Sequence, residues 1–308
     1  MKHFINLKDI KTNDLKKILR DAKKRKHSRK NLGTLDVDKG APLKGKILIQ
    51  MFEKPSLRTR LSFYLAIRQL GGGTITLRSN ELHLGKGGES LADTAKILST
   101  YGDGFMLRTD SDKKITEFLK YTKIPLINGL SPSSHPTQVL SDIFTVEEIK
   151  KKPISKLNIC WIGDSNNVLN SLIVASVKFS FTLNIACPKN YKPKKFILNW
   201  VKKNNRKINI FHEPKIAVKN ADVVFSDKVI SLNDKVNIKK KMKDFRKFHI
   251  DTKLLKLAPK SIFLHCLPRG NEVSEKVFLG KKSHVWKQAS NRVHVQKSIL
   301  LYCFGKLR

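Results

Sequence analysis

The segment FEKPSLRTR, residues 52–60, carries polar side chains whose types and order suit the binding of a small phosphate-bearing molecule. Ser56 stands where a helix would begin, and Arg58 and Thr59 follow it closely. Free backbone N–H groups and the helix dipole make such a start an anion site. An arginine adds a fork that can hold two phosphate oxygens. An ordinary capped helix with exposed arginines is the alternative interpretation.

Three further segments place reactive side chains beside expected elements. Arg108 ends an apolar run, at the carboxyl end of an expected strand, and His135 stands directly before an expected helix. Gln138, three residues after His135, lies on the same helical face. Cys266 follows another strand and precedes Pro268, which stiffens a turn beside the thiol. Taken alone, His135 would be a hydrogen-bonded loop histidine and Cys266 a buried cysteine. The prediction of a binding site therefore depends on the combination of these segments.

Apolar periodicity predicts the elements that must position these residues. An amphipathic helix over 12–29, capped by Thr12 or Asn13, precedes a strand–helix alternation in which Ser90 caps a later helix. The alternation pauses at a linker, 150–156, and then restarts. Expected strands are 47–52, 74–77, 105–107, 125–128, 157–162, 182–186, 208–211, 222–226 and 261–265; expected helices are 57–70, 90–101, 111–121, 136–149, 167–179, 193–204 and 290–304.

This alternation on both sides of a linker predicts an α/β fold with two doubly wound parallel-sheet domains. Ligands of such sheets lie beyond the carboxyl ends of the strands. The length of 308 residues suits two domains, and a hydrophobic content of 40% excludes disorder as the main state. We find no apolar run long enough for a membrane helix and no signal-peptide pattern.

Cysteine spacing and net charge bear on which classes of protein and which partners the sequence allows. The four cysteines are far apart, which disfavours a disulfide scaffold or a zinc site and favours a reducing cytoplasm. The chain has 62 basic and 25 acidic residues, a net charge of +37. That excess could serve nucleic acid or an anionic substrate, or reflect a lysine-rich composition on solvated faces. The basic residues are scattered along the chain, and no aromatic residues interleave with them. We therefore favour the interpretation that the charge reflects a lysine-rich composition on solvated faces.

Taken together, these segments resemble the aspartate/ornithine carbamoyltransferase family, most closely its ornithine carbamoyltransferase branch. The resemblance runs nearly end to end, as far as Arg292. SLRTR at 56–60 and HPTQ at 135–138 are shared with the aspartate branch. HCLPR at 265–269 and the spacing of Asp227 and Ser231 look like the ornithine branch.

The resemblance implies a two-substrate enzyme with a cleft between its domains. Carbamoyl phosphate would bind domain 1–149, to which a C-terminal helix, about 286–308, returns, and L-ornithine would bind domain 150–285. The products would be L-citrulline and phosphate, in arginine biosynthesis. The resemblance implies neither a metal nor an organic cofactor. It implies a homotrimer, or an assembly of trimers, with active sites shared between neighbours.

The family's site residues map onto this sequence in two groups. Those implied for carbamoyl phosphate are Ser56, Leu57 (main chain), Arg58, Thr59, Arg108, His135, Gln138 and Arg292, with His83 supplied by a neighbour's lid loop. Those implied for ornithine are Asn167, Asp227, Ser231 and Leu232 (main chain). Cys266 and the Leu267 carbonyl would lie between the substrates. The catalytic roles would belong to Arg58, Arg108, His135, Asp227 and Cys266.

The expected chemistry is attack of a neutral δ-amine on a carbonyl carbon. Negative charge then develops on the carbonyl oxygen and on the leaving phosphate, so fixed cations and N–H donors aimed at both are the expected device. A cleft that closes on both reactants supplies much of the remainder. The leaving phosphate can accept the proton of the amine.

Several positions depart from the family pattern and leave alternatives open. His83 stands where glutamine is usual, the pair Gly87-Gly88 makes the lid one residue longer, and Ser290 replaces a glutamate. Val229, Leu232 and Asn233 replace a usual tryptophan, methionine and glycine. The alternatives are a carbamoyltransferase for putrescine, an acylated ornithine or aspartate, a basic nucleic-acid-binding protein, and an inactive homologue. Cys266 disfavours aspartate, because that branch usually has proline there.

Overall fold

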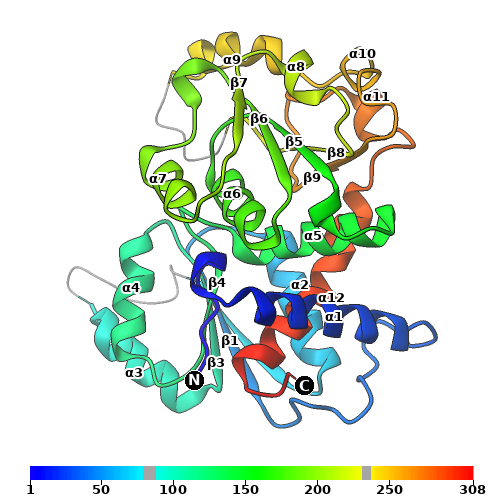
Figure 1. Ribbon diagram of the computed structural model, residues 1–308. Coiled ribbons are helices and arrows are strands. Elements are labelled where there is room, and N and C mark those ends of the chain that lie inside the picture. Colours follow the sequence, from blue (N-terminus) through cyan, green and yellow to red (C-terminus); the bar gives the residue numbers. More distant parts are fainter. Residues whose placement is uncertain (79–87, 231–236, 308) are drawn as a thin grey trace. The chain divides into compact units, whose positions relative to one another are not determined.

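The computed structural model describes residues 1–78, 88–230 and 237–307, which form two compact units (Figure 1). Unit 1 comprises Met1–Ser141 and Ser290–Arg308, and unit 2 comprises Asp142–Ala289. Two helices, α5 (Pro136–Lys150) and α12 (Val285–Cys303), have residues in both units. In the part of the chain described, no helix is long and apolar enough to cross a membrane.

Unit 1 is built on a four-stranded parallel sheet. Its strand order is β2-β1-β3-β4, so the connections leaving β1 and β2 run in opposite directions across the sheet. Apolar residues line both faces, as expected of a sheet covered by helices. The strands are β1 (Ile47–Phe52), β2 (Gly73–Arg78), β3 (Gly104–Arg108) and β4 (Leu126–Leu130).

Helices cover both faces of this sheet (Figure 1). On one face, Leu98 and Phe118 pack with Ile49 and Phe105 in a buried apolar cluster. On the other face lies α2, which packs against β2. The helices of this unit, besides α5 and α12, are α1 (Thr12–Ser28), α2 (Leu57–Gln69), α3 (Leu91–Tyr101) and α4 (Asp112–Tyr121).

Unit 2 repeats the design on a five-stranded parallel sheet with the order β7-β6-β5-β8-β9. Its cluster of buried residues joins β5 and β8 to four short helices that follow β7, while α6 contacts β6 and α7. The strands are β5 (Asn158–Ile162), β6 (Thr182–Ala186), β7 (Asn209–Phe211), β8 (Val223–Ser226) and β9 (Ile262–His265). The helices are α6 (Asn167–Phe179), α7 (Lys195–Lys203), α8 (Pro214–Val218), α9 (Ile238–Phe245), α10 (Thr252–Leu255) and α11 (Glu275–Phe278).

The predicted α/β class with two parallel sheets and a C-terminal helix that joins the first unit is confirmed. Among the predicted caps, Ser90 accepts the Asp93 N–H at 3.1 Å, as expected. The predicted cap of α1 is wrong: the N-cap is Lys11, without a side-chain hydrogen bond, and Thr12 is already helical. The last helix begins at Val285 rather than near 290, because Val285 is buried in the apolar cluster of unit 2.

Candidate active site

The start of α2 lies at the carboxyl end of β1, where the sequence predicts an anion site. Ser56 has extended backbone angles, and its Oγ accepts the Thr59 N–H at 3.3 Å, which makes it the N-cap. Arg58 is half-buried and Thr59 is buried, whereas the Leu57 side chain is 71% exposed. Because a leucine side chain has no hydrogen-bonding group, Leu57 can bind an anion only through its main chain. The first turn of α2 presents backbone N–H groups with a guanidinium beside them.

Arg108 lies beside this turn. It is the last residue of β3, and it pairs with Phe52, the last residue of β1, in the parallel register. The strand order reverses at β1 and β3, and in doubly wound sheets ligands bind at that point, outside the carboxyl ends. The fold thus brings Arg108 and the start of α2 to the expected ligand position of unit 1.

Arg292 reaches the same group of residues from α12. Its Nη1 donates to Gln138 Oε1 at 2.7 Å and its Nη2 donates to Thr59 Oγ1 at 2.8 Å. All three side chains are nearly fully buried. Three segments that are far apart in sequence, α2, α5 and α12, therefore meet through one guanidinium.

His135, directly before α5, is buried among these cations. Burial and the positive charges of Arg292, Arg108 and Arg58 hold its pKa well below the usual value of 6.5. The imidazole is therefore neutral near pH 7, so it can donate one hydrogen bond without adding a further positive charge.

A polar turn positions His135. Asn128 Nδ2 donates to Ser134 Oγ at 3.0 Å and to the Ile5 carbonyl at 3.1 Å, and the Ser131 N–H donates to the Ser134 carbonyl at 2.9 Å. Asn128, Ser131 and Ser134 are all buried. These bonds fix the path of the chain from β4 into α5.

Glu53 is a positioning residue that sequence reasoning did not single out. Its carboxylate accepts hydrogen bonds from Thr109 Oγ1 at 2.5 Å, the Asp110 N–H at 3.3 Å and Lys114 Nζ at 2.6 Å. It thereby ties the end of β1 to the residues directly after Arg108. An acidic residue inside an otherwise basic anion-binding motif was the available signal.

In unit 2, three polar residues form a chain of contacts at the carboxyl ends of β5, β8 and β9. Asn166 Nδ2 donates to Asp227 Oδ2 at 2.6 Å, and Cys266 Sγ donates to Asp227 Oδ1 at 2.9 Å. Asn166 also caps α6 through its Oδ1, which accepts the Val168 and Leu169 N–H groups. Asn167, its half-buried neighbour, is the first residue of α6.

A buried histidine fixes the turn that carries Cys266 and Leu267. His265 Nδ1 accepts the Leu267 N–H at 3.0 Å, so Nε2 bears the proton that it shares with Glu272 Oε1, also at 3.0 Å. Glu272 accepts the Gly270 N–H at 2.6 Å as well. Despite burial, these bonds lower the pKa of Glu272. Leu267 has φ 61°, an unusual angle for leucine that such contacts must hold.

The predicted site residues therefore fall into two groups. The structure brings together Ser56, Arg58, Thr59, Arg108, His135, Gln138 and Arg292 in unit 1. In unit 2 it brings Asp227 to Cys266, which Leu267 follows, and Asn167 follows Asn166, the residue that binds Asp227. His83, Ser231 and Leu232 lie outside the described residues. Within the described part, no group of three or more histidine, cysteine or acidic side chains could hold a metal ion.

Comparison with known families agrees with this division. Residues 2–148 match the model for the carbamoyl-P binding domain of aspartate/ornithine carbamoyltransferase, and residues 155–303 match the model for its Asp/Orn binding domain. The chain belongs to the aspartate/ornithine carbamoyltransferase family. The second match runs through α12, although residues from Ser290 onward belong to unit 1.

Relatives within the family extend the likeness over the whole chain. An ornithine carbamoyltransferase of Rhizobium meliloti is 41% identical over 307 residues, which is 99% of each chain. One from Brucella suis is 40% identical and covers 98% of this chain and 96% of its own. Among solved structures, the ornithine carbamoyltransferase of Pyrococcus furiosus has a TM-score of 0.91 at 36% identity, covering 100% and 98%. The anabolic ornithine carbamoyltransferase of Campylobacter jejuni has a TM-score of 0.89 at 36% identity, covering 100% of both chains.

Proposed function

We propose that this chain transfers the carbamoyl group of carbamoyl phosphate to the δ-amine of L-ornithine, giving L-citrulline and phosphate, as a step of arginine biosynthesis. The observation that carries the proposal is the buried group in unit 1. There, Arg292 bonds Thr59 and Gln138, and Arg58 and Arg108 lie near a neutral His135. The names of the relatives support the choice of ornithine.

In this proposal the start of α2 holds the phosphate. The N–H groups from Leu57 onward and the side chains of Ser56, Arg58 and Thr59 bind its oxygens, with Arg108 beside them. Backbone donors at a helix start are fixed before the anion arrives, so little reorganisation opposes binding. A second ligand-binding group, His83, would come from a neighbouring subunit.

The carbonyl oxygen of the carbamoyl group is placed among Arg58, Thr59 and His135, with Gln138 at its amide and Arg292 beside them. Attack by the amine forms a C–N bond while the C–O bond to phosphate breaks. Negative charge passes from the carbonyl oxygen to the leaving phosphate, and these donors stabilise it at both positions. The phosphate takes the proton released by the amine.

For ornithine, we assign the α-amino and carboxylate groups to Asn167, Asp227, Ser231 and the main chain of Leu232. The hydrogen bonds of Asp227 with Asn166 and Cys266 support its role, because they orient a carboxylate that can meet an ammonium group. Cys266 and the Leu267 carbonyl are placed between the two substrates. The δ-amine must arrive deprotonated, and no metal or organic cofactor takes part in the proposal.

The test is citrulline formation by the purified protein with carbamoyl phosphate and, in parallel, ornithine, putrescine or aspartate. We expect ornithine to give the highest kcat/KM by at least tenfold. Preference for putrescine or aspartate would overturn the choice of amine. No carbamoylated product from any amine would overturn the proposed activity.

We also propose a homotrimer, or an assembly of trimers, in the cytoplasm. Leu57, Leu61 and Tyr64 are exposed at helical spacing along α2, an apolar stripe that suits burial against another copy. All four cysteines are free, which agrees with a reducing compartment. Light scattering should give three times the 35.2 kDa chain mass, or a multiple of that trimer. A monomer would contradict the assembly.

A further inference from the structure

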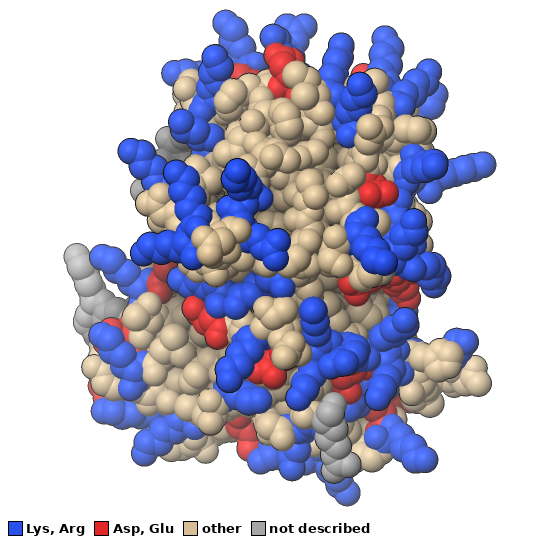
Figure 2. Space-filling view, in the orientation of Figure 1, with Lys and Arg blue, Asp and Glu red and all other residues tan. Residues whose placement is uncertain are grey.

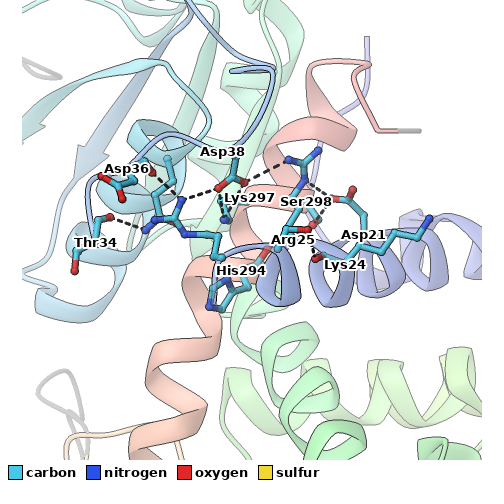
Figure 3. Close-up of polar contacts among 12 residues, drawn as sticks. Asp21, Lys24, Arg25, Thr34, Asp36, Asp38, His294, Lys297 and Ser298 are labelled. Carbon is cyan, nitrogen blue, oxygen red and sulfur yellow. Dashed lines mark hydrogen bonds and ion pairs between the residues drawn. The ribbon is translucent and has the colours of Figure 1, made fainter. Parts of the chain in front are cut away.

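A group of buried charged residues in unit 1 has no part in the proposed chemistry (Figure 3). It joins α1 to α12 and to the segment before β1. We call it the Asp38 cluster, and its members are Asp21, Arg25, Arg29, Asp38, Lys297 and Ser298. Asp38 is 7% exposed and the Lys297 side chain is fully buried.

Asp38 is the hub of this cluster. Its carboxylate accepts from Arg29 Nη1 at 2.7 Å, from Lys297 Nζ at 3.0 Å and from Arg25 Nη1 at 3.4 Å. Asp21 binds the same arginine, Arg25, at 2.9 Å and accepts Ser298 Oγ at 2.6 Å. Two carboxylates thus face three cations; Arg29, Asp38 and Lys297 are buried, and Asp21 and Arg25 are half-buried.

Such a cluster is a poor means of stabilising a fold. Desolvating several charges opposes folding, and well-packed apolar residues often serve as well or better. Burial and the nearby cations of Arg29 and Arg25 lower the pKa of Lys297 to about 8, although Asp38 acts to raise it. What directional charged contacts do provide is a defined position for the elements that carry them.

The element that these contacts position is α12, which carries Arg292. Lys297 is five residues after Arg292, a rise of about 7.5 Å along the helix. Lys26 Nζ, from α1, donates to Asn291 Oδ1 at 2.6 Å. Contacts therefore hold α12 before Arg292, at Asn291, and after it, at Lys297 and Ser298.

The cluster also connects to the helix that begins the anion site. The Asp38 N–H donates to the carbonyl of Gln69 at the end of α2, at 2.7 Å. At the other end of α2, Thr59 accepts the hydrogen bond from Arg292. The two helices are thus linked twice, once through Arg292 and Thr59 and once through Lys297 and Asp38. A shift or rotation of α12 would break both links.

We propose that Lys297, through its ion pair with Asp38, is a positioning residue that holds Arg292 in the anion site. The inference rests on the proposed function for the identity of the anion. It assigns to the cluster a task in substrate binding, carried out through the placement of one helix rather than through contact with substrate.

The test compares Lys297→Met with Lys46→Met. Lys46 pairs with Asp103 at 2.7 Å in the same unit but at the surface, so its variant controls for the loss of a lysine charge. Two quantities are measured: kcat/KM for carbamoyl phosphate, and the dissociation constant of phosphonoacetamide by calorimetry. Because small misplacements of a binding group can cost up to about a hundredfold, we expect Lys297→Met to weaken both by about tenfold to a hundredfold. Lys46→Met should stay within about twofold of the unaltered protein.

A double-mutant cycle separates positioning from general destabilisation. If Lys297 acts through Arg292, Lys297→Met should change phosphonoacetamide binding by less than twofold when Arg292 is already alanine. An equal effect in both backgrounds, or no effect in the unaltered protein, would overturn the inference. Calorimetry measures binding without turnover. If the unaltered protein binds phosphonoacetamide but forms no citrulline, the proposed function is wrong and the positioning role can still be tested.

Less disruptive variants cover the case in which Lys297→Met does not fold. Lys26→Met and Ser298→Ala each remove one contact of α12 at a half-buried or small side chain. Each substitution should weaken phosphonoacetamide binding when made alone, and should have less effect when Arg292 is already alanine. Folded variants with unchanged binding would reject the positioning role.

Discussion

In the unit 1 site, His135 is a neutral hydrogen-bond donor and the three arginines near it are fixed cations. Burial keeps the imidazole neutral by lowering its pKa, and the fixed positive charges of Arg292, Arg108 and Arg58 act in the same direction. A neutral donor among cations can polarise a carbonyl oxygen without repelling the guanidinium groups to which we assign the phosphate. Single side chains thus have separate tasks although they lie in one buried group.

Arg58 gives the prediction that belongs at this scale. Replacing it with glutamine removes a forked cation at the start of α2, so we expect kcat/KM for carbamoyl phosphate to fall by about a thousandfold. The thermal midpoint should change little, because the half-buried side chain is not part of an apolar cluster. Arg68→Gln, an exposed arginine on the same helix, is the matched control. Equal activity of the two variants in a citrulline assay would refute the assignment.

The sequence allowed these side chains to be picked out because the motifs around them are contiguous. Ser56, Arg58 and Arg108 stand next to predictable strand ends and helix starts. The bracing residues Glu53, Asn166 and Glu272 could not be picked out in the same way. Glu53 and Asn166 bind partners 61 residues away, which only the folded chain brings together. Glu272 binds His265 and Gly270 nearby in sequence, through a turn whose path the folded chain sets.

At the scale of elements, the turn after β9, which carries Cys266 and Leu267, depends on a hydrogen-bonded histidine and glutamate. His265 binds the Leu267 N–H on one side and Glu272 on the other, and Glu272 also binds the Gly270 N–H. The turn that carries Cys266 is thereby fixed by residues that are not among those assigned to substrate binding. Its bent path is set from within unit 2.

Glu272→Gln tests this arrangement. Glu272 Oε1 accepts from both His265 and Gly270, so the amide oxygen can still receive both donors, but the loss of the negative charge weakens both buried bonds. We expect KM for ornithine to rise and kcat to fall, together by about tenfold, while the dissociation constant of phosphonoacetamide stays unchanged. Glu275→Gln, at an exposed residue on α11, serves as the control. An altered phosphonoacetamide affinity would argue against a local role.

Element prediction succeeded for the strands and the longer helices and failed for the short helices of unit 2. The spans of β1 and α6 match the expected strand and helix residue for residue. Helices α8, α10 and α11 have five residues or fewer, too few to show a helical period, and they were not foreseen. Their residues become helical because they pack on the cluster that covers β5 and β8.

At the scale of the whole molecule, the buried charge of Lys297 makes the stability of the fold depend on pH. Lys297 has a folded pKa of about 8, below its usual 10.5. Between those values the unfolded chain binds the proton and the folded chain does not, so stability rises with pH across that window. This contribution is complete above about pH 10.5 and is lost as pH falls through about 8.

We therefore predict how Lys297→Met compares with the unaltered protein from pH 7 to pH 11. As pH rises, the free energy of unfolding of the unaltered protein should increase by about 3 kcal/mol relative to that of the variant. Urea unfolding at each pH measures the difference. A difference that does not change with pH would show that the lysine keeps its ordinary pKa.

Also at the scale of the whole molecule, the net charge of +37 comes from many lysines and arginines. Lysines and arginines are spread over the visible face, with acidic residues among them (Figure 2). Scattered charge predicts weak nucleic-acid binding that depends on salt rather than on sequence. Binding to a short DNA duplex should be lost between about 50 and 200 mM salt in a fluorescence anisotropy titration. Tight binding that persists near 150 mM would favour a nucleic-acid partner.

The most direct test of the account is a crystal structure with phosphonoacetyl-ornithine, which joins mimics of both substrates. We predict that its phosphonate lies at the first turn of α2, bound by the N–H groups there and by the side chains of Arg58 and Arg108. Its ornithine part should meet Asp227. A phosphonate bound elsewhere, or arginines turned away from it, would contradict the claim that this helix start is where the reaction takes place.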